Sequence, residues 1–130
     1  LCGIAVQEAV SDLLGLHPLI KWPNDVLIDR KKFCGILVEA AWQADGLQGV
    51  ILGIGINISP DSVPESVHQN FPATCLESSC IAPVDRYQLL RQVLISIQKW
   101  RNQLGSPAFM QQWETNLANL KDLLEQRDIK

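Results

Sequence analysis

The 130-residue sequence lacks three features that would assign it quickly to a class of protein. No apolar run approaches the roughly eighteen residues that a membrane span requires, so no membrane association is expected. The net charge is -3, which gives no general attraction for nucleic acid. The four cysteines form no Cys-x-x-Cys pair. Buried free thiols in a reducing cytoplasm are therefore favoured over disulfides or a metal site.

A start signal is also absent. Leu1 stands where an initiator Met would, and the residues that follow resemble the middle of an apolar helix rather than a signal peptide. We therefore expect the sequence to be a piece of a longer protein. The composition, 47% apolar and 19% charged, is that of a globular chain. A chain of this length buries roughly two thirds of its unfolded surface, so we expect a single domain.

The first half of the chain is predicted to contain one helix and a block of strands. Apolar residues recur at helical spacing over residues 2–15, and Gly15 is placed to end that helix in a left-handed conformation. Strand-like segments joined by short turns follow, one of them a hairpin turn at Asp45-Gly46. The predicted strands are residues 19–22, 26–29, 33–42 and 49–58.

The second half is predicted to be a long loop followed by two helices. Residues 59–83 are rich in Ser, Pro, Asn and Asp, and an apolar stripe beyond them predicts a helix that stops at Gly105. Ser106-Pro107 then begins a last helix. The side chains expected to face inward are Leu89, Leu90, Val93, Leu94, Ile97 and Leu104 in one helix, and Phe109, Trp113, Leu117, Leu120 and Leu124 in the other. This order of elements predicts an α+β fold, with helices backing a mixed, mostly antiparallel sheet.

The strand predicted at 49–58 has two faces of different character under a period of two. One face is wholly apolar: Val50, Leu52, Ile54, Ile56 and Ile58. The other carries Gly53 and Gly55 and ends in Asn57. Interior glycines weaken a strand and are tolerated where something approaches the backbone closely. We interpret these two as the floor of a site for a flat ligand; a Trp or a helix packed on them is the alternative. A Rossmann motif is excluded, because its glycines lie in a strand-to-helix turn.

Glu39 is the single charge in the strand predicted at 33–42. A buried carboxylate must be paired or neutralised, and Lys21 on a neighbouring strand is a candidate partner. The alternative is that Glu39 reaches solvent at an edge. His17 and His68 receive no role, because no arrangement of a Ser or Cys nucleophile accompanies them.

Four polar residues, Lys21, Asp25, Lys32 and Asn57, are predicted to converge. The Pro-Asn dipeptide before Asp25 predicts a tight turn that presents the carboxylate at the end of a strand. Lys32 is the last residue of a basic turn. Such turns usually just lie in solvent, but the ammonium of Lys32 can swing over the sheet. Two ammonium groups, a carboxylate able to hold Mg²⁺ and a neutral amide suit a nucleotide phosphate, for which charge neutralisation is most of the task.

Three motifs resemble those of the biotin protein ligase family, the biotin–[acetyl-CoA-carboxylase] ligases. They are K-W-P-N-D at 21–25, K-x-x-G-I-L-V-E at 32–39 and G-I-G-I-N at 53–57. The resemblance implies a fold like the catalytic core of class II aminoacyl-tRNA synthetases. It also implies a two-step ligase reaction: biotin and MgATP give biotinyl-5′-AMP, and the biotinyl group then passes to a lysine of a biotin carboxyl carrier domain.

The resemblance implies a role for each residue of the predicted site. Lys32, Lys21 and Asp25 would be catalytic, and Lys32 would contact the carboxyl of biotin and the adenylate linkage. Asp25 would also help to position Mg²⁺ or the incoming amine. Asn57 and Lys21 would face ATP or the adenylate. The biotin slot would be lined by Lys32, Gly35, Leu37, Gly53 and Gly55.

Two parts of the family pattern are not found. The family's Gly- and Arg-rich loop, which closes over biotin and adenylate, is expected before this sheet, but the sequence has no Gly-Arg pair. The small C-terminal β-domain is not found either. Residues 1–130 are therefore expected to be a partial catalytic domain that is weak or inactive alone. The resemblance also implies a homodimer through the strand at 35–41. The alternatives are a lipoate ligase relative and a non-catalytic remnant that serves as a dimerisation module.

Overall fold

The computed structural model describes residues 1–65 and 72–119. The elements in chain order are α1 (Cys2–Leu14), β1 (Leu19–Lys21), β2 (Asp25–Ile28), β3 (Lys31–Gln43), β4 (Gly46–Ile56), the short 3₁₀ helices η1 (Pro60–Ser62) and η3 (Leu76–Ser79), α2 (Arg86–Arg101) and α3 (Pro107–Thr115). The predicted helix and strand order is found, with strand ends moved by a few residues. None of the helices in this described part has the length and apolar character that a membrane span needs.

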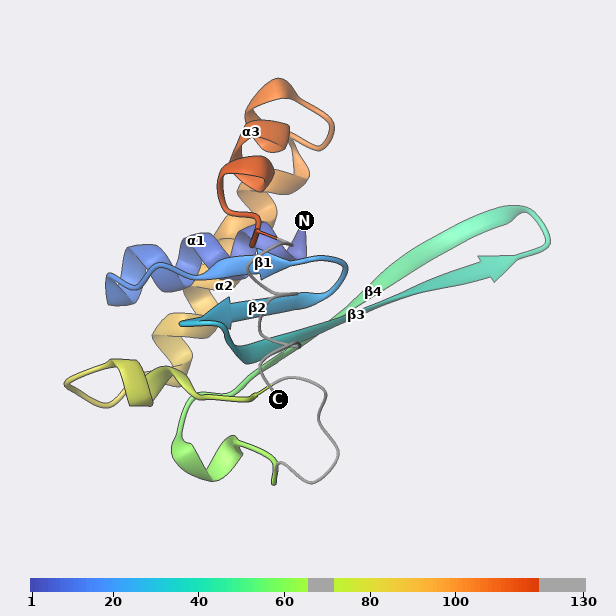
Figure 1. Ribbon diagram of the computed structural model, residues 1–130. Coiled ribbons are helices and arrows are strands. Elements are labelled where there is room, and N and C mark those ends of the chain that lie inside the picture. The colour runs from blue at the N-terminus through green and yellow to red at the C-terminus, as the bar shows by residue number, and fades with distance from the viewer. Residues whose placement is uncertain (66–71, 120–130) are drawn as a thin grey trace.

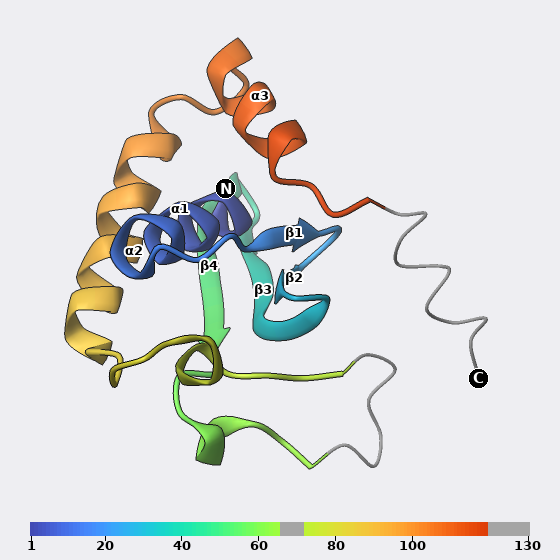
Figure 2. The same cartoon turned by 60° about the vertical axis from the view of Figure 1, so that its left-hand side comes forward.

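The four strands form one sheet in the order β1-β2-β3-β4, and every neighbouring pair is antiparallel. Two short parallel bridges, Ile20 with Leu117 and Lys32 with Ala73, extend the sheet at its margins. Figure 2 shows α1 lying between α2 and the strands. The sheet is therefore mixed, mostly antiparallel and backed by helices, as the sequence predicted.

Helix α1 is rich in apolar residues that are buried on several sides, because it lies between α2 and the sheet, and its end has a suitable cap. Ile4, Ala5 and Val10 are fully or almost fully buried. Gly15 adopts φ 66°, a left-handed conformation that glycine reaches without strain, and its N–H donates to the Ser11 carbonyl at 3.0 Å. The predicted end of this helix is confirmed.

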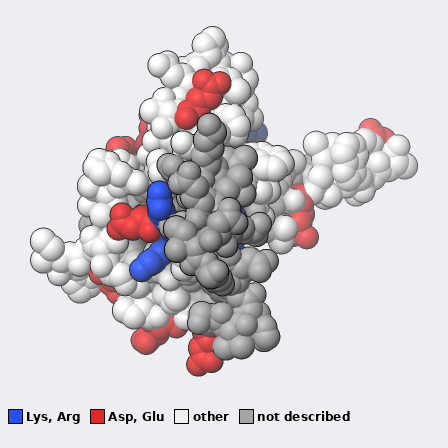
Figure 3. Space-filling model, in the orientation of Figure 1, with Lys and Arg blue, Asp and Glu red and all other residues white. Residues whose placement is uncertain are grey.

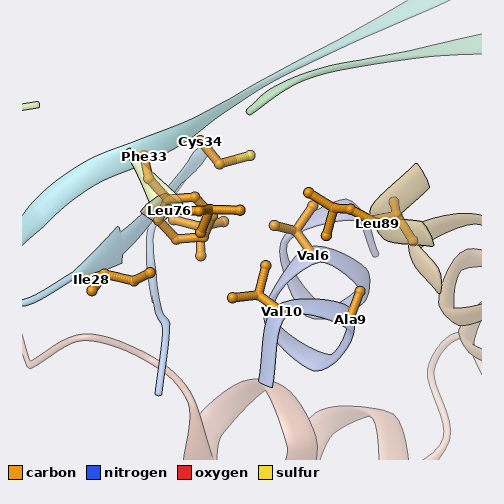
Figure 4. Close-up of a cluster of buried hydrophobic side chains, with 10 residues drawn as sticks. Val6, Ala9, Val10, Ile28, Phe33, Cys34, Leu76 and Leu89 are labelled. Carbon is orange, nitrogen blue, oxygen red and sulfur yellow. The ribbon is translucent and has the colours of Figure 1, made fainter. Parts of the chain in front are cut away.

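The main hydrophobic core joins both long helices to the base of the sheet (Figure 4). Its buried members come from α1, β2, β3, η3 and α2: Val6, Ala9, Val10, Val26, Ile28, Phe33, Cys34, Leu76, Leu89 and Val93. Close packing of this kind holds the backbone at the base of the sheet in one arrangement. The polar residues of the predicted site therefore stand on a rigid base.

The predicted inward face of α2 is wrong in part. Leu90 and Leu94 are 56% and 55% exposed, and Leu104 beyond the helix is 55% exposed. The buried residues of α2 are Leu89, Val93, Ser96 and Trp100. They follow one another at helical spacing along the side that meets α1, and a single packed helix covers only that side of the broader apolar stripe. Polar contacts to α1 support the same arrangement, since Glu8 accepts a hydrogen bond from the Trp100 indole at 2.9 Å.

Helix α3 begins as predicted and ends earlier than its apolar spacing suggests. The Ser106 side chain caps its start by accepting from the Phe109 N–H at 3.1 Å. Phe109 and Trp113 pack against a second core cluster. The helix stops at Thr115, because the chain then turns to pair with β1 and Leu117 lies in a bridge rather than on a helix face. The remaining predicted inward residues, Leu120 and Leu124, lie outside the described residues.

The hairpin of β3 and β4 projects well beyond the helices (Figure 1). Its turn is the predicted Asp45-Gly46, where Gly46 has φ 124°. Ile36, Ile54 and Ile56 at the base pack against the core. The large apolar side chains further out are exposed: Leu37, Val38, Trp42, Leu47, Val50, Ile51 and Leu52. Only the C-terminal end of the predicted apolar face is thus covered by the described residues.

The predicted buried pair of Glu39 with Lys21 is wrong. Glu39 is exposed and lies opposite Ile51 of β4. Strand β2 pairs with β3 only as far as Gly35. Because Glu39 lies beyond that point on the projecting hairpin, neither β2 nor β1 reaches it. The alternative, a carboxylate in solvent, is the observed one.

Candidate functional site

The turn between β1 and β2 brings the first two predicted site residues together. Lys21 and Asp25 are the last pair of the antiparallel β1–β2 register, and the Trp22–Pro23 peptide bond in the turn between them is cis. Lys21 Nζ lies 3.4 Å from Asp25 Oδ2. The turn therefore does present the Asp25 carboxylate at the start of β2.

Asp25 also binds the second predicted lysine. Lys32 Nζ lies 2.8 Å from Asp25 Oδ1, so the two carboxylate oxygens each face one ammonium group. The carboxylate is the least exposed of the three side chains, at 13%. Partial burial strengthens such contacts relative to bulk water. Two ammonium groups and one carboxylate give the group of three a net positive charge. Three of the four residues predicted to converge, Lys21, Asp25 and Lys32, therefore lie together.

Lys32 reaches Asp25 by crossing the sheet above Gly35. A Cβ atom built on Gly35 would stand 3.3 Å from Lys32 Cε and 3.4 Å from Nζ. The prediction that the ammonium swings over the sheet, rather than away from it, is therefore confirmed. Glycine at position 35 keeps the path of this side chain open.

A cavity of about 450 Å³ lies beside Asp25 and Lys32 on the face of the β3–β4 hairpin that carries the glycines. Its lining residues are Asn24, Asp25, Lys32, Gly35, Ile36, Leu37, Gly53, Ile54 and Gly55. All five residues predicted to line a biotin slot are among them.

The glycine floor of this cavity is open in the described part of the chain. The heavy atom nearest to a Cβ built on Gly55 is the Gly35 carbonyl oxygen, at 3.9 Å. At Gly53 the corresponding atom is the Leu37 carbonyl oxygen, at 3.2 Å. Both neighbours belong to the backbone of β3, and neither is a Trp or a helix. Within the described residues, the alternative interpretation of the glycines is therefore wrong.

Asn57 lines a smaller neighbouring cavity of about 160 Å³ rather than the main one. Lys32, Gly35 and Gly55 line both cavities, so Asn57 is adjacent to the other site residues without touching the main cavity. Its amide nitrogen donates to the Thr74 carbonyl at 3.2 Å. The amide group is thus partly committed to a contact within the protein.

The segment that contains Thr74 is a part of the site that sequence reasoning missed. Residues 72–76 lie beside Lys32 and Asn57, although 59–83 as a whole was predicted to be a loop. One signal could have found the segment: Ala73-Thr74-Cys75-Leu76 is a short apolar stretch inside a polar region. Cys75 and Leu76 are buried, as such a stretch predicts.

The cysteine nearest the site is inert as a nucleophile. Burial, and next the negative charge of Asp25, raise the pKa of the Cys34 thiol to about 12. A thiol that stays protonated neither attacks nor binds a metal. Cys2, Cys34, Cys75 and Cys80 are all free thiols; the first three are buried, as predicted, and Cys80 is half-buried. The described residues contain no group of three or more His, Cys, Asp or Glu side chains that could hold a metal ion.

One face of the molecule carries charges of both signs. On the face shown in Figure 3, Lys and Arg atoms form small patches beside Asp and Glu atoms. The cations that the described residues bring together on one carboxylate are Lys21 and Lys32, on Asp25.

Comparison with known proteins agrees with these features. Residues 3–57 match the model of the biotin/lipoate A/B protein ligase family. The chain is 35% identical over 101 residues to the bifunctional ligase/repressor BirA of Bacillus subtilis, covering 76% of this chain and 30% of that protein. It is 37% identical over 107 residues to the biotin–[acetyl-CoA-carboxylase] ligase of Mycobacterium tuberculosis, covering 77% of this chain and 37% of that protein.

Solved structures of biotin protein ligases resemble this chain as well. The apo biotin protein ligase of Aquifex aeolicus superimposes with a TM-score of 0.72 at 29% identity, covering 90% of this chain and 51% of that one. The complex of the same enzyme with biotin and ATP superimposes with a TM-score of 0.64 at 27% identity. The fold is therefore that of the biotin protein ligases.

Residues 3–57 belong to the biotin/lipoate A/B protein ligase family, as the three motifs within them implied. The chain spans about a third of the length of these curated relatives and about half of the solved structure.

Proposed function

We propose that residues 1–130 form part of the catalytic domain of a biotin protein ligase, which activates biotin with ATP and transfers it to a lysine of a carrier domain. The observation that carries the proposal is the pair Lys21 and Lys32, held on the single carboxylate of Asp25 beside a glycine-floored cavity. The relatives that are named biotin–[acetyl-CoA-carboxylase] ligases, and the solved complex with biotin and ATP, support the same chemistry.

In the first step, a carboxylate oxygen of biotin attacks the α-phosphorus of ATP. The bond from that phosphorus to the pyrophosphate oxygen breaks, and biotinyl-5′-AMP forms. Negative charge on the phosphate oxygens rises in the transition state, so a fixed ammonium stabilises the transition state more than the ground state. Lys32 serves in this role above the glycine floor, and Lys21 adds a second positive charge near the phosphates.

Asp25 holds the two ammonium groups in place. Without a shared counter-ion, the ammonium groups of Lys21 and Lys32 would repel one another, and their long side chains would reorient. Because each carboxylate oxygen faces one lysine, Asp25 fixes both before the substrates arrive. Preorganised charge of this kind costs no reorganisation at the moment of reaction.

In the second step, the neutral ε-amine of a carrier lysine attacks the carbonyl carbon of the adenylate. The bond from that carbon to the phosphate oxygen breaks, AMP leaves, and the amine releases a proton as the amide forms. Asp25 is the carboxylate at the cavity and orients the incoming amine. Asn57 faces the adenylate from the smaller cavity.

Biotin itself would lie on the open part of the sheet. A fused ring system can lie directly on the backbone where glycine leaves space that larger residues would fill. Gly35, Gly53 and Gly55 supply that surface, and Leu37 supplies an apolar contact beside it.

Mg²⁺ enters this proposal only as an ion carried by the nucleotide. One carboxylate together with substrate phosphates is a common way to hold Mg²⁺, and Asp25 is the candidate carboxylate. Both of its oxygens already face ammonium groups, and the described residues offer no three-ligand cluster. These residues alone therefore do not form a site for the ion.

We also propose a carrier-domain partner and a homodimeric assembly for this protein. The carrier would be the biotin carboxyl carrier domain of a biotin-dependent carboxylase in the cytoplasm. A homodimer would form through the strand at 35–41, whose edge is not paired with β2 beyond Gly35. Sedimentation of the intact protein tests the dimer, and a monomer at all accessible concentrations would remove it.

ATP–pyrophosphate exchange by the intact protein tests the activity and separates it from its nearest alternative. We expect exchange that depends on biotin, and we expect a gain in mass of one biotinyl group on an added carrier domain. Exchange supported by lipoate and not by biotin would instead assign a lipoate ligase. No exchange with either acid would favour a non-catalytic module.

The isolated chain offers a second measurement. We expect residues 1–130 alone to give weak or no turnover, because a Gly- and Arg-rich loop is expected to complete the site. Robust turnover by residues 1–130 would contradict that account of the loop.

A further inference from the structure

The backbone of Lys32 is held by a segment from a distant part of the sequence. Lys32 lies in β3 beyond the point where β4 ends, and residues 72–74 take the place of β4 beside it. The Lys32 N–H donates to the Pro72 carbonyl at 2.8 Å, and the Thr74 N–H donates to the Lys32 carbonyl at 2.8 Å. Both backbone groups of Lys32 on this edge are therefore bound by one segment.

The segment is itself anchored at Thr74 and just beyond it. The Asn57 amide donates to the Thr74 carbonyl at 3.2 Å, and the Leu76 N–H donates to the Asn57 carbonyl at 2.9 Å. Cys75 and Leu76 are buried to 1% and 0% exposure. The segment cannot shift away from β3 without disturbing the core, so it forms a fixed support for Lys32.

The support matters because the Lys32 side chain is long and partly exposed. Its side chain is 38% exposed, and within the described residues its ammonium pairs with Asp25. A lysine stem has four rotatable bonds, so the position of the ammonium depends on where the stem starts and in which direction it leaves the backbone. A shift of the Lys32 backbone would carry the ammonium away from its place over Gly35.

We propose that Thr74 is a positioning residue for adenylate formation and that it acts through Lys32. Its backbone N–H holds the Lys32 carbonyl and so fixes the start of the side chain that reaches over Gly35. This inference rests on the proposed function, since it assigns Lys32 to the first step. The Thr74 side chain has no part in it.

Substitutions at neighbouring positions separate the backbone group from the side chain. Thr74→Pro removes the N–H that binds Lys32, whereas Thr74→Ala keeps it. Ala73→Pro is the matched control. In this parallel pairing, residues 72 and 74 bind Lys32, and the backbone N–H and C=O of Ala73 point away from β3. Proline in place of either residue suits an extended segment.

The experiment measures kcat and KM for biotin-dependent pyrophosphate exchange by the intact protein and its variants. Displacing a catalytic group by about 1 Å costs up to about 100-fold, so Thr74→Pro is expected to lower kcat by roughly 10- to 100-fold with a smaller change in KM. Thr74→Ala and Ala73→Pro are expected to stay within about threefold of the unsubstituted protein, since both keep the bond.

A double-mutant cycle shows whether the effect passes through Lys32. In a Lys32→Ala background, Thr74→Pro is expected to cost less than about threefold more, because residues that act as a unit are not additive. An equal loss with and without Lys32 would overturn the proposal and make Thr74 merely structural. Wild-type kcat in Thr74→Pro would overturn it as well.

A second variant keeps the test decisive if Thr74→Pro does not fold. Replacing Thr74 by its α-hydroxy acid changes the amide to an ester, which deletes the same N–H without a proline ring. The same loss of kcat is expected, and unchanged kcat would overturn the inference. If the unsubstituted protein shows no exchange with any acid, the proposed function fails and this inference falls with it. If that protein is active and the ester variant is equally active, the inference alone fails.

Discussion

The ammonium of Lys32 lies over the backbone of Gly35, 3.4 Å from the place that a Cβ on residue 35 would take. Lys32 and Gly35, three positions apart in the sequence, are thus coupled, because the Lys32 side chain lies where a side chain on residue 35 would be. The contact atoms are the far end of a flexible chain, so an added methyl group would displace them rather than distort the sheet.

Gly35→Ala is therefore expected to move the Lys32 ammonium while leaving the fold intact. We expect biotin-dependent pyrophosphate exchange to fall by about tenfold or more, in line with the cost of small misplacements in catalytic geometry. The melting temperature should change by only a few degrees, as for other substitutions that cost less than about 1 kcal/mol. Full exchange activity in a stable Gly35→Ala variant would show that this position of Lys32 is not needed.

Lys32→Ala tests the role of the ammonium directly. Removing a single transition-state donor typically costs about 100-fold or more, so we expect exchange to fall by at least one order of magnitude. Lys31→Ala is the control, because Lys31 is the exposed neighbour in the same basic turn and lines neither cavity. Equal losses in the two variants would point to a general effect of charge rather than to a specific site.

Gly55→Ala tests whether the glycine floor binds a ligand. A Cβ at this position would meet nothing closer than the Gly35 carbonyl oxygen at 3.9 Å, an ordinary contact, so the protein itself has room for it. We expect unchanged thermal stability and a biotin affinity lowered by about tenfold, because one buried methyl group in a fitted pocket changes binding by roughly 1–3 kcal/mol.

Gly49→Ala is the matched control for that measurement. Gly49 lies in the same strand, has open space around it and stands outside the cavity. Isothermal titration of both variants with biotin gives the comparison. Equal affinity in Gly55→Ala and the unsubstituted protein would remove Gly55 from the biotin slot.

The buried thiol of Cys34 makes stability depend on pH in the alkaline range. Its pKa is raised from 9.0 to about 12, first by burial and then by Asp25. In the unfolded chain the thiol loses its proton near the ordinary value, whereas the folded protein keeps it. The unfolded state therefore binds fewer protons between about pH 9 and 12, and the free energy of unfolding falls as pH rises through that window, by up to about 1.4 kcal/mol per pH unit.

Urea unfolding at a series of pH values measures this dependence. Cys34→Ala is expected to be less stable at neutral pH, because it leaves a cavity, but to lose part of the alkaline slope. Cys2 and Cys80, whose pKa values are also raised, account for some of the slope that remains. An identical slope with and without Cys34 would contradict its assignment as a buried thiol.

Features that depend on near neighbours were predictable from the sequence. Gly15 ends α1, Ser106 caps α3 and Asp45-Gly46 forms the hairpin turn, each as expected, because caps and turns are set by a few adjacent residues. The glycine face of β4 was predictable for a similar reason, since a period of two is a local rule. The α+β class followed from the order of these elements.

Features that depend on distant partners were not predictable. The exposure of Leu90 and Leu94 depends on which side of α2 meets α1, and nothing local in an apolar stripe states that. The solvent position of Glu39 depends on where β2 stops along β3. The backbone hydrogen bonds of Lys32 with Pro72 and Thr74 join positions about forty residues apart in the sequence. No spacing rule predicts such a contact.

The amino-acid sequence by itself determined which functional groups are present: two lysines, a carboxylate, an amide and a row of glycines on predicted strands. The tertiary structure determined which of them lie together. Only the packed sheet decides that both lysines share the two oxygens of Asp25, that Lys32 passes over Gly35, and that a remote segment supports its backbone. The physical reason is that local propensity acts over a few residues, whereas contacts a few ångströms long between distant residues exist only once the core is closed.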